Sequence, residues 1–186
     1  MKTLLVGMAA AMVSASVMAG TEPFNLSLTP AIAVYDRSET INGMTLSIWG
    51  ENPQNSFALG LVNGTTGQST GLSLGLLNYA NTYKGCQWGL VNYTTQDFSG
   101  WQGGPFFGLL VSVVNYTGGE MSGLQTGVVN YAGQLTGLQV GVVNYADAAD
   151  AGVQIGLVNI IHHNKHWFSE LPDELAPAMI LVNWRF

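Results

Sequence analysis

The chain has 186 residues, of which only 9% are charged and 47% are hydrophobic, and its formal net charge is −6 at neutral pH. Soluble domains carry about 25% charged residues, so the surface of an ordinary cytosolic enzyme is not expected. The scarcity of lysine and arginine argues against a nucleic-acid partner, and the apolar content argues against disorder.

The N-terminal residues have the pattern of a secretory signal peptide. Lys2 supplies a short positive region, residues 4–17 are apolar with small side chains, and residues 17–19 fit a small-residue cleavage site. The apolar run is too short for a spanning helix, and no later run reaches the roughly 18 residues that such a helix needs. We therefore expect a signal peptide at 1–19 and a single exported β domain at 20–186.

A repeated motif dominates the rest of the chain. Residues 25–35 and 44–49 are expected to form two leading strands, and a Gly-Leu-Val-Asn-Tyr type of unit then recurs over about 57–160. Successive motif asparagines are 15, 14, 23, 15, 14, 15 and 24 residues apart, so two units carry insertions. These asparagines are Asn63, Asn78, Asn92, Asn115, Asn130, Asn144 and Asn159, with Asn183 in a degenerate last copy.

The fullest unit, residues 137–146, has the period of two that is typical of a strand. The unit length leaves a strand of about nine residues and a turn of about five. Strict alternation places Val142 and Asn144 on one face and Gln139 and Val143 on the other. The first face is the more apolar, so we expect it to point toward lipid.

Two architectures fit a unit of 14 or 15 residues. In the first, each unit is one strand of an antiparallel meander, and a closing strand at 176–186 completes a small outer-membrane β-barrel of about ten strands. Transmembrane strands need about 9–11 residues, which matches the period. In the second, each unit is one coil of a β-solenoid, and the motif asparagines stack as an internal ladder. Both are all-β, and the barrel is our leading interpretation.

The last strand carries a more specific pattern. Val182, Trp184 and the C-terminal Phe186 place apolar side chains at alternate positions. This arrangement is typical of the closing strand by which bacterial outer-membrane barrels are recognised for insertion. We therefore expect these three residues to serve as an assembly signal.

The repeat units and the ending Val-Asn-Trp-Arg-Phe resemble a bacterial family of surface-repeat-containing exported proteins, with repeats of the type GLQxGLVN. The resemblance covers residues 57–186, and the lead-in segments 26–30 and 41–50 are also similar. It implies a surface or outer-membrane protein without an assigned reaction, and it transfers no catalytic motif. The chain departs from the pattern at 105–107 and in the long segment 161–176.

The two long connections are expected on one side of the molecule, where they are candidates for contacting a surface ligand. Their aromatic and histidine residues are Phe98, Trp101, His162, His163, His166, Trp167 and Phe168. The histidines could bind a metal ion, but no paired ligand motif accompanies them, so we expect no metal site. No cofactor and no catalytic residue is expected either.

These observations lead to three hypotheses about function. The first is a non-enzymatic outer-membrane or cell-surface barrel with a structural or interaction role. Its partners would be membrane lipid, the barrel-assembly machinery and an unidentified surface ligand. The second is a secreted or periplasmic β-solenoid that binds a partner along its flat repeat face. The third is an exported enzyme that uses the 161–175 loop.

Overall fold

The computed structural model describes residues 21–104 and 112–186, so the expected signal peptide at 1–19 lies outside the described part of the chain. Within that part every regular element is a β-strand, which confirms the all-β class. The strands are β1 (Thr21–Thr29), β2 (Ile32–Ala33), β3 (Thr40–Glu51), β4 (Asn55–Leu74), β5 (Leu77–Trp88), β6 (Val91–Thr94), β7 (Phe98–Gly103), β8 (Ser112–Ile161) and β9 (Ala178–Arg185).

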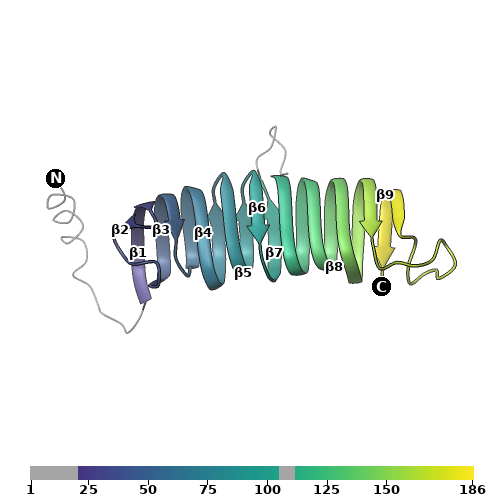
Figure 1. Ribbon diagram of the computed structural model, residues 1–186, viewed down its shortest axis with the longest axis horizontal. Helices are drawn as coiled ribbons and strands as arrows, with labels where there is room; N and C mark the ends of the chain where they lie inside the picture. Colours follow the sequence, from purple (N-terminus) through teal and green to yellow (C-terminus); the bar gives the residue numbers. More distant parts are fainter. Residues whose placement is uncertain (1–20, 105–111) are drawn as a thin grey trace.

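Successive repeat units pair side by side in parallel and in register. Asn63 pairs with Asn78, Asn78 with Asn92, and Asn92 with Asn115, although the last two are 23 residues apart. Figure 1 shows the result as a long stack of coils, in which β8 winds through several turns. The antiparallel meander, on which the barrel interpretation rested, is therefore wrong for the repeat units.

The side chains explain why parallel pairing is preferred. A period of 14 or 15 residues can hold either a strand with its hairpin turn or one complete coil. Only in-register parallel coils place each motif asparagine beside its own equivalent, where the two amides can bond in the interior. The asparagines from Asn78 to Asn159 are all fully buried, so this pairing satisfies their amide groups.

The expected alternation is correct over most of a unit and fails at one corner. Val142 is exposed and Gln139 is buried, as strict alternation requires. Asn144 is nevertheless buried, while Val143 and Tyr145 are only half-buried. The chain bends at the motif, so two consecutive residues, Val142 and Val143, both point outward and the phase of the alternation reverses.

The buried asparagines form a continuous ladder along the stack. Each Nδ2 donates to the Oδ1 of the next asparagine toward the C-terminus, at 2.7–3.0 Å. The second amide hydrogen is also used: Asn130 donates to the carbonyl of Val140, and Asn144 to that of Ile155. Buried amides are stable only when bonded, so the ladder ties each coil to the next.

A second ladder consists of glutamines and runs the opposite way. Each Nε2 donates to the Oε1 of the preceding glutamine, toward the N-terminus, at 2.7–2.9 Å. Its members are Gln87, Gln102, Gln125, Gln139 and Gln154. The ladder ends at Gln154, whose Oε1 has no hydrogen-bond partner among the described residues.

Apolar side chains fill the rest of the interior. The cluster contains Tyr83, Phe98, Met121 and Leu135, with alanines completing the narrow space. Tyr83 and Phe98 stack with ring centroids 6.1 Å apart. Tyr83, Phe98, Met121, Leu135 and Ala149 thus follow one another along the stack with side chains of decreasing size, and Ile161 lies beyond them at the C-terminal end.

One corner of the coil requires glycine. Gly85 and Gly137 have φ angles of +133° and +128°, which residues with a Cβ rarely adopt. A Cβ on Gly85 would also lie 2.1 Å from the carbonyl oxygen of Gly71 in the coil before it. The recurrent glycine therefore serves both the turn and the close stacking of backbones.

The two ends of the stack are closed differently from its middle. At the N-terminal end β1 pairs with β3 in parallel and with the short β2 antiparallel. At the C-terminal end β9 pairs antiparallel with the last coil, from Gly152 to Ile160. The closing strand expected at 176–186 is therefore present, at Ala178–Arg185. The antiparallel pairings of β2 and β9 thus end the parallel order of the repeats at the two ends of the stack.

Candidate interaction surfaces

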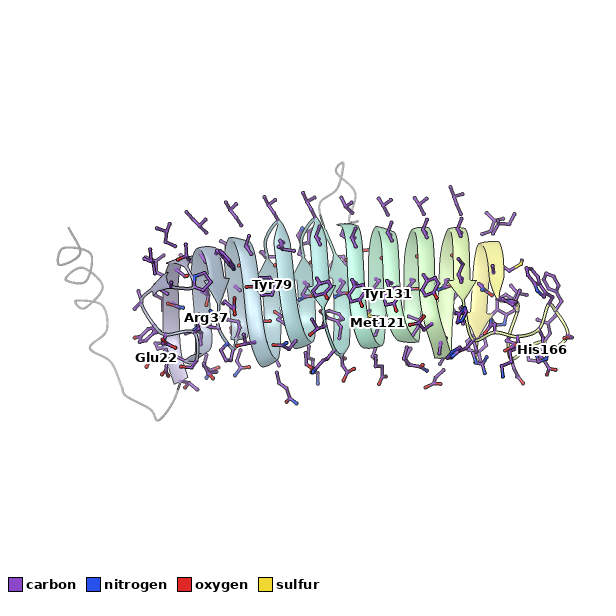
Figure 2. All side chains as sticks on the ribbon, viewed as in Figure 1. Glu22, Arg37, Tyr79, Met121, Tyr131 and His166 are labelled. Atoms are coloured by element: carbon purple, nitrogen blue, oxygen red, sulfur yellow. The ribbon has the colours of Figure 1, made fainter. Side chains whose placement is uncertain are left out.

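One long edge of the stack is apolar from end to end, and we call it the apolar edge. It consists of the residues one and two positions before each motif asparagine. Among the described residues, those four positions before the asparagine lie along its flank. The outermost row is Leu61, Leu76, Leu90, Val113, Val128, Val142 and Leu157. Figure 2 shows this edge as a row of side chains drawn in carbon alone.

The apolar edge is well exposed for a surface of this composition. Leu61 and Leu76 are each 53% exposed and Leu157 is 62% exposed. The glycine between the flanking and outermost rows has no space for a side chain: a Cβ on Gly141 would lie 2.6 Å from Nδ2 of Asn130. The interior ladder thus leaves no space for a side chain at this glycine, and the leucine or valine that follows it points outward.

The opposite edge carries the charges of the repeats and is called the polar edge. Lys84, Asp97, Glu120, Asp147 and Asp150 all lie three to six residues after a motif asparagine. That position is about half a coil from the outermost apolar row, which places them across the stack. Figure 2 shows nitrogen and oxygen atoms along this edge.

The polar edge is also hollowed. A hollow of about 440 Å³ crosses four neighbouring coils and is lined by Thr70, Lys84, Asp97, Ser99 and Glu120, among others. Oδ1 of Asp97 accepts a hydrogen bond from the amide of Glu120 in the next coil, at 2.9 Å. Hydroxyl groups and carboxylates thus dominate this side of the molecule.

The tyrosines that follow the motif asparagines form an external stack. Tyr93, Tyr116, Tyr131 and Tyr145 lie with ring centroids 4.7–5.4 Å apart and nearly parallel planes. The hydroxyls of Tyr131 and Tyr145 both donate to the carboxylate of Asp147. The hydrogen bond to Asp147, together with burial, raises the pKa of Tyr131 to about 12.

Two of the expected contact residues lie elsewhere than predicted. Phe98 and Trp101 belong to the regular strand β7, and Phe98 is buried in the core. Trp101 packs edge-on against Trp88 and donates from Nε1 to Thr126 Oγ1 at 3.0 Å. The placement of both in a surface loop is therefore wrong, because the extra residues of this unit lie between Gln102 and Asn115.

The other expected contact residues do lie in an exposed loop at the C-terminal end. His162, His163, His166, Trp167 and Phe168 are all exposed. Trp167 and Phe168 are 59% and 53% exposed, and their rings lie 6.2 Å apart. In the described residues no three histidine, cysteine, aspartate or glutamate side chains gather in an arrangement that would hold a metal ion.

A buried carboxylate, absent from the sequence prediction, anchors this loop. Glu174 accepts hydrogen bonds from the amides of Lys165 and His166, both at 2.9 Å, and lies 2.7 Å from Nη1 of Arg185. Burial raises the pKa of Glu174, but these amides, the His166 ring and Arg185 outweigh it, so the pKa lies below its ordinary value. The loop and β9 are thereby fastened together as one cap.

The residues expected to form an assembly signal lie in this cap. Val182 pairs with Ile155 of the last coil and is half-buried. Trp184 donates from Nε1 to the carbonyl of Pro172, while Phe186 is 65% exposed. Their role in assembly stays a prediction.

Comparison of the chain with protein-family models, curated proteins and solved structures finds no match. The resemblance to exported surface-repeat proteins therefore stays a prediction. Helices long and apolar enough to cross a membrane do not occur in the part of the chain that the structure describes.

Proposed function

We propose that this chain is an exported, non-enzymatic β-solenoid that acts as a rigid binding module. The observation that carries the proposal is the in-register stacking of the motif asparagines, which repeats every outward side chain at the same place in each coil. A solenoid of this kind offers long, uniform faces instead of a single enclosed pocket. Binding along such a face is the activity that this geometry supports best.

The arrangement of titratable groups supports a non-enzymatic role. Glu174 is held by Arg185 and two amides, and Asp147 accepts hydrogen bonds from two tyrosine hydroxyls. These carboxylates are engaged in holding the fold. The apolar edge and the sparse charge of the repeats support export, together with the signal peptide expected at 1–19.

Cysteine cross-linking tests the coil architecture directly. Lys84 and Ser99 are in-register partners on adjacent coils, so their Cα atoms lie within the roughly 4.4–6.8 Å that a disulfide spans. In a Cys86→Ser background, Lys84→Cys with Ser99→Cys should form an intrachain disulfide under mild oxidation. Lys84→Cys with Ser122→Cys is the matched control, because the coil of Ser99 lies between those positions and their Cα atoms are beyond reach.

Fractionation of the producing bacterium tests the location. We expect the mature chain, shortened at its N-terminus, outside the cytoplasm. An unprocessed cytoplasmic product would contradict the proposal. So would an integral outer-membrane protein that migrates faster on a gel before boiling and fails to form the Lys84–Ser99 cross-link, since that result indicates an antiparallel barrel.

A further inference from the structure

We propose that the apolar edge docks on the lipid surface of a membrane, so that the stack lies flat along the bilayer with its polar edge in water. The inference rests on the proposed function, because the edge exists only if the coils are stacked in register. It names the partner of the module as lipid. Residues of the outermost row, such as Leu61, Leu76 and Leu157, would enter the boundary between headgroups and acyl chains.

The apolar edge extends along most of the described coils. Leu76, Val142 and Leu157 are exposed, and the row extends at the C-terminal end to Ile180 and Leu181, at 69% and 66% exposure. Soluble monomers rarely leave so extended an apolar surface in water. Leu90, Val113 and Val128, in the middle of the row, are half-buried, so its most exposed parts lie toward the two ends. A partner that covers both parts must itself be extended.

The charges of the repeat units are kept away from the apolar edge. No charged residue occupies the apolar edge or its flanks in any repeat unit, and the unit charges lie across the stack on the polar edge. Four of those five charges are acidic: Asp97, Glu120, Asp147 and Asp150. Binding would therefore depend on apolar burial and not on attraction to anionic headgroups, and the acidic edge would remain in water.

The uniform composition of the apolar edge fits lipid better than it fits a protein partner. A specific protein interface has a polar rim and about one hydrogen bond per 100–200 Å². The apolar edge offers leucine, valine and isoleucine at nearly every position of its outermost rows, and one coil is hardly distinguishable from the next. Lipid needs no such landmarks. Tryptophans favour membrane interfaces; Trp49 lies in the edge itself, on the Val62 row, and Trp88 lies on its flank, on the Leu59 row.

The shape of the edge also disfavours a second copy of the chain. The outermost row occupies a bend of the coil, where the backbone turns between Gly75 and Leu77. Two such convex edges meeting along a line would bury little area, whereas fluid acyl chains can surround the edge on both flanks. Lipid therefore covers more of the exposed apolar surface than a symmetric dimer would.

Flotation with vesicles of phosphatidylcholine tests the proposal. We expect the mature wild-type chain to co-float with these uncharged vesicles, and binding to change less than about twofold when NaCl is raised to about 0.5 M. The variant with Leu76→Gln, Val142→Thr and Leu157→Gln should lose at least about tenfold in partitioning, because three inserted side chains become polar. A matched triple variant on the other side, Gln68→Ser, Gln134→Ser and Ala151→Ser, should co-float like the wild type.

Each other outcome overturns the proposal in a recognisable way. Release of the wild type by salt indicates electrostatic binding, and a wild type that remains with the unbound fraction excludes a lipid partner. If the wild type is a dimer, the triple variant with Leu76→Gln is a monomer, and neither chain floats, the partner is a second copy of the chain. Each chain is also made in the Cys86→Ser background with Lys84→Cys and Ser99→Cys, so that the cross-link is measured beside flotation. If the otherwise unaltered chain forms the cross-link but does not float, lipid docking alone is refuted. If the cross-link does not form, the solenoid itself is refuted.

Discussion

The central coils and the C-terminal cap solve the same problem with different chemistry. In the coils, neutral amides of one residue type bond to their own equivalents, as Asn115 does to Asn92 and Asn130. In the cap, a buried carboxylate of Glu174 is held by two amides and by Arg185. A self-complementary group can be repeated without limit, whereas a charged pair is made once. The repeat therefore builds length, and the cap ends it.

Breaking the ladder in the middle should give the largest effect. Asn115→Ala leaves Nδ2 of Asn92 without its ladder acceptor and Oδ1 of Asn130 without its donor, in a fully buried interior. We expect a loss of about 2–5 kcal/mol in the free energy of unfolding, measured by urea denaturation. The exposed Asn81→Ala is the control and should cost less than about 1 kcal/mol. Equal effects of the two substitutions would show that the ladder does not stabilise the coils.

Removing the charge of the cap should give a smaller and local effect. Glu174→Gln weakens the contacts to Arg185 and to the amides of Lys165 and His166, and we expect about 2 kcal/mol of lost protection in the cap. Hydrogen exchange should rise over residues 162–186 and stay unchanged over the coils. Uniformly faster exchange would mean that the cap and the coils unfold as one unit.

Lowering the pH should weaken the C-terminal cap and leave the amide ladders of the coils unchanged. The pKa of Glu174 lies below its ordinary value of 4.5, so its contribution is complete above about pH 4.5 and is lost as the pH falls through the lower folded value. The ladder amides do not titrate in this range. Amide resonances of Lys165 and His166 should therefore shift on acidification while those of Asn130 and Asn144 remain. In Glu174→Gln the acid-dependent shift at Lys165 and His166 should be absent.

The smallest effect is expected on the tyrosine stack outside the coils. Tyr131→Phe removes one hydrogen bond to Asp147 and keeps the stacked ring, so the free energy of unfolding should fall by no more than about 1 kcal/mol. Asp147→Asn should lower the pKa of Tyr131 from about 12, visible as earlier phenolate absorbance in an alkaline titration. An unchanged titration would show that Asp147 does not hold this hydroxyl.

The sequence predicts the repeat, its strand character and the importance of the motif asparagine, because each depends on local pattern. It leaves the pairing direction open, since a hairpin and a coil have the same period. A second pattern could have decided it: glutamines recur at Gln87, Gln102, Gln125, Gln139 and Gln154, in step with the asparagines. Gln139 and Asn144 are five residues apart, so strict alternation would place them on opposite faces. Two recurrent amide rows at an odd spacing indicate an interior with a corner between them.

The positions of the expected contact residues are predicted in part, for a related reason, while their role in binding stays a prediction. Gly100-Trp101-Gln102 has the same form as Gly137-Leu138-Gln139, which identifies Trp101 as part of a regular unit. The spacing of the motif asparagines does not reveal this register by itself, so it predicts the inserted residues too close to the N-terminus. Trp167 and Phe168 were placed correctly, because no repeat pattern competes for them after Ile161. The ion pair of Glu174 with Arg185 could not be inferred, since it depends on how the loop returns to the last coil.

The opposite directions of the two interior ladders have an electrical consequence. Each row of aligned amides adds its dipoles end to end, as the peptide groups of a helix do. The asparagine ladder points its donors toward the C-terminus and the glutamine ladder toward the N-terminus, so their axial dipoles largely cancel. The stack can gain or lose a coil without building up opposite partial charges at its ends.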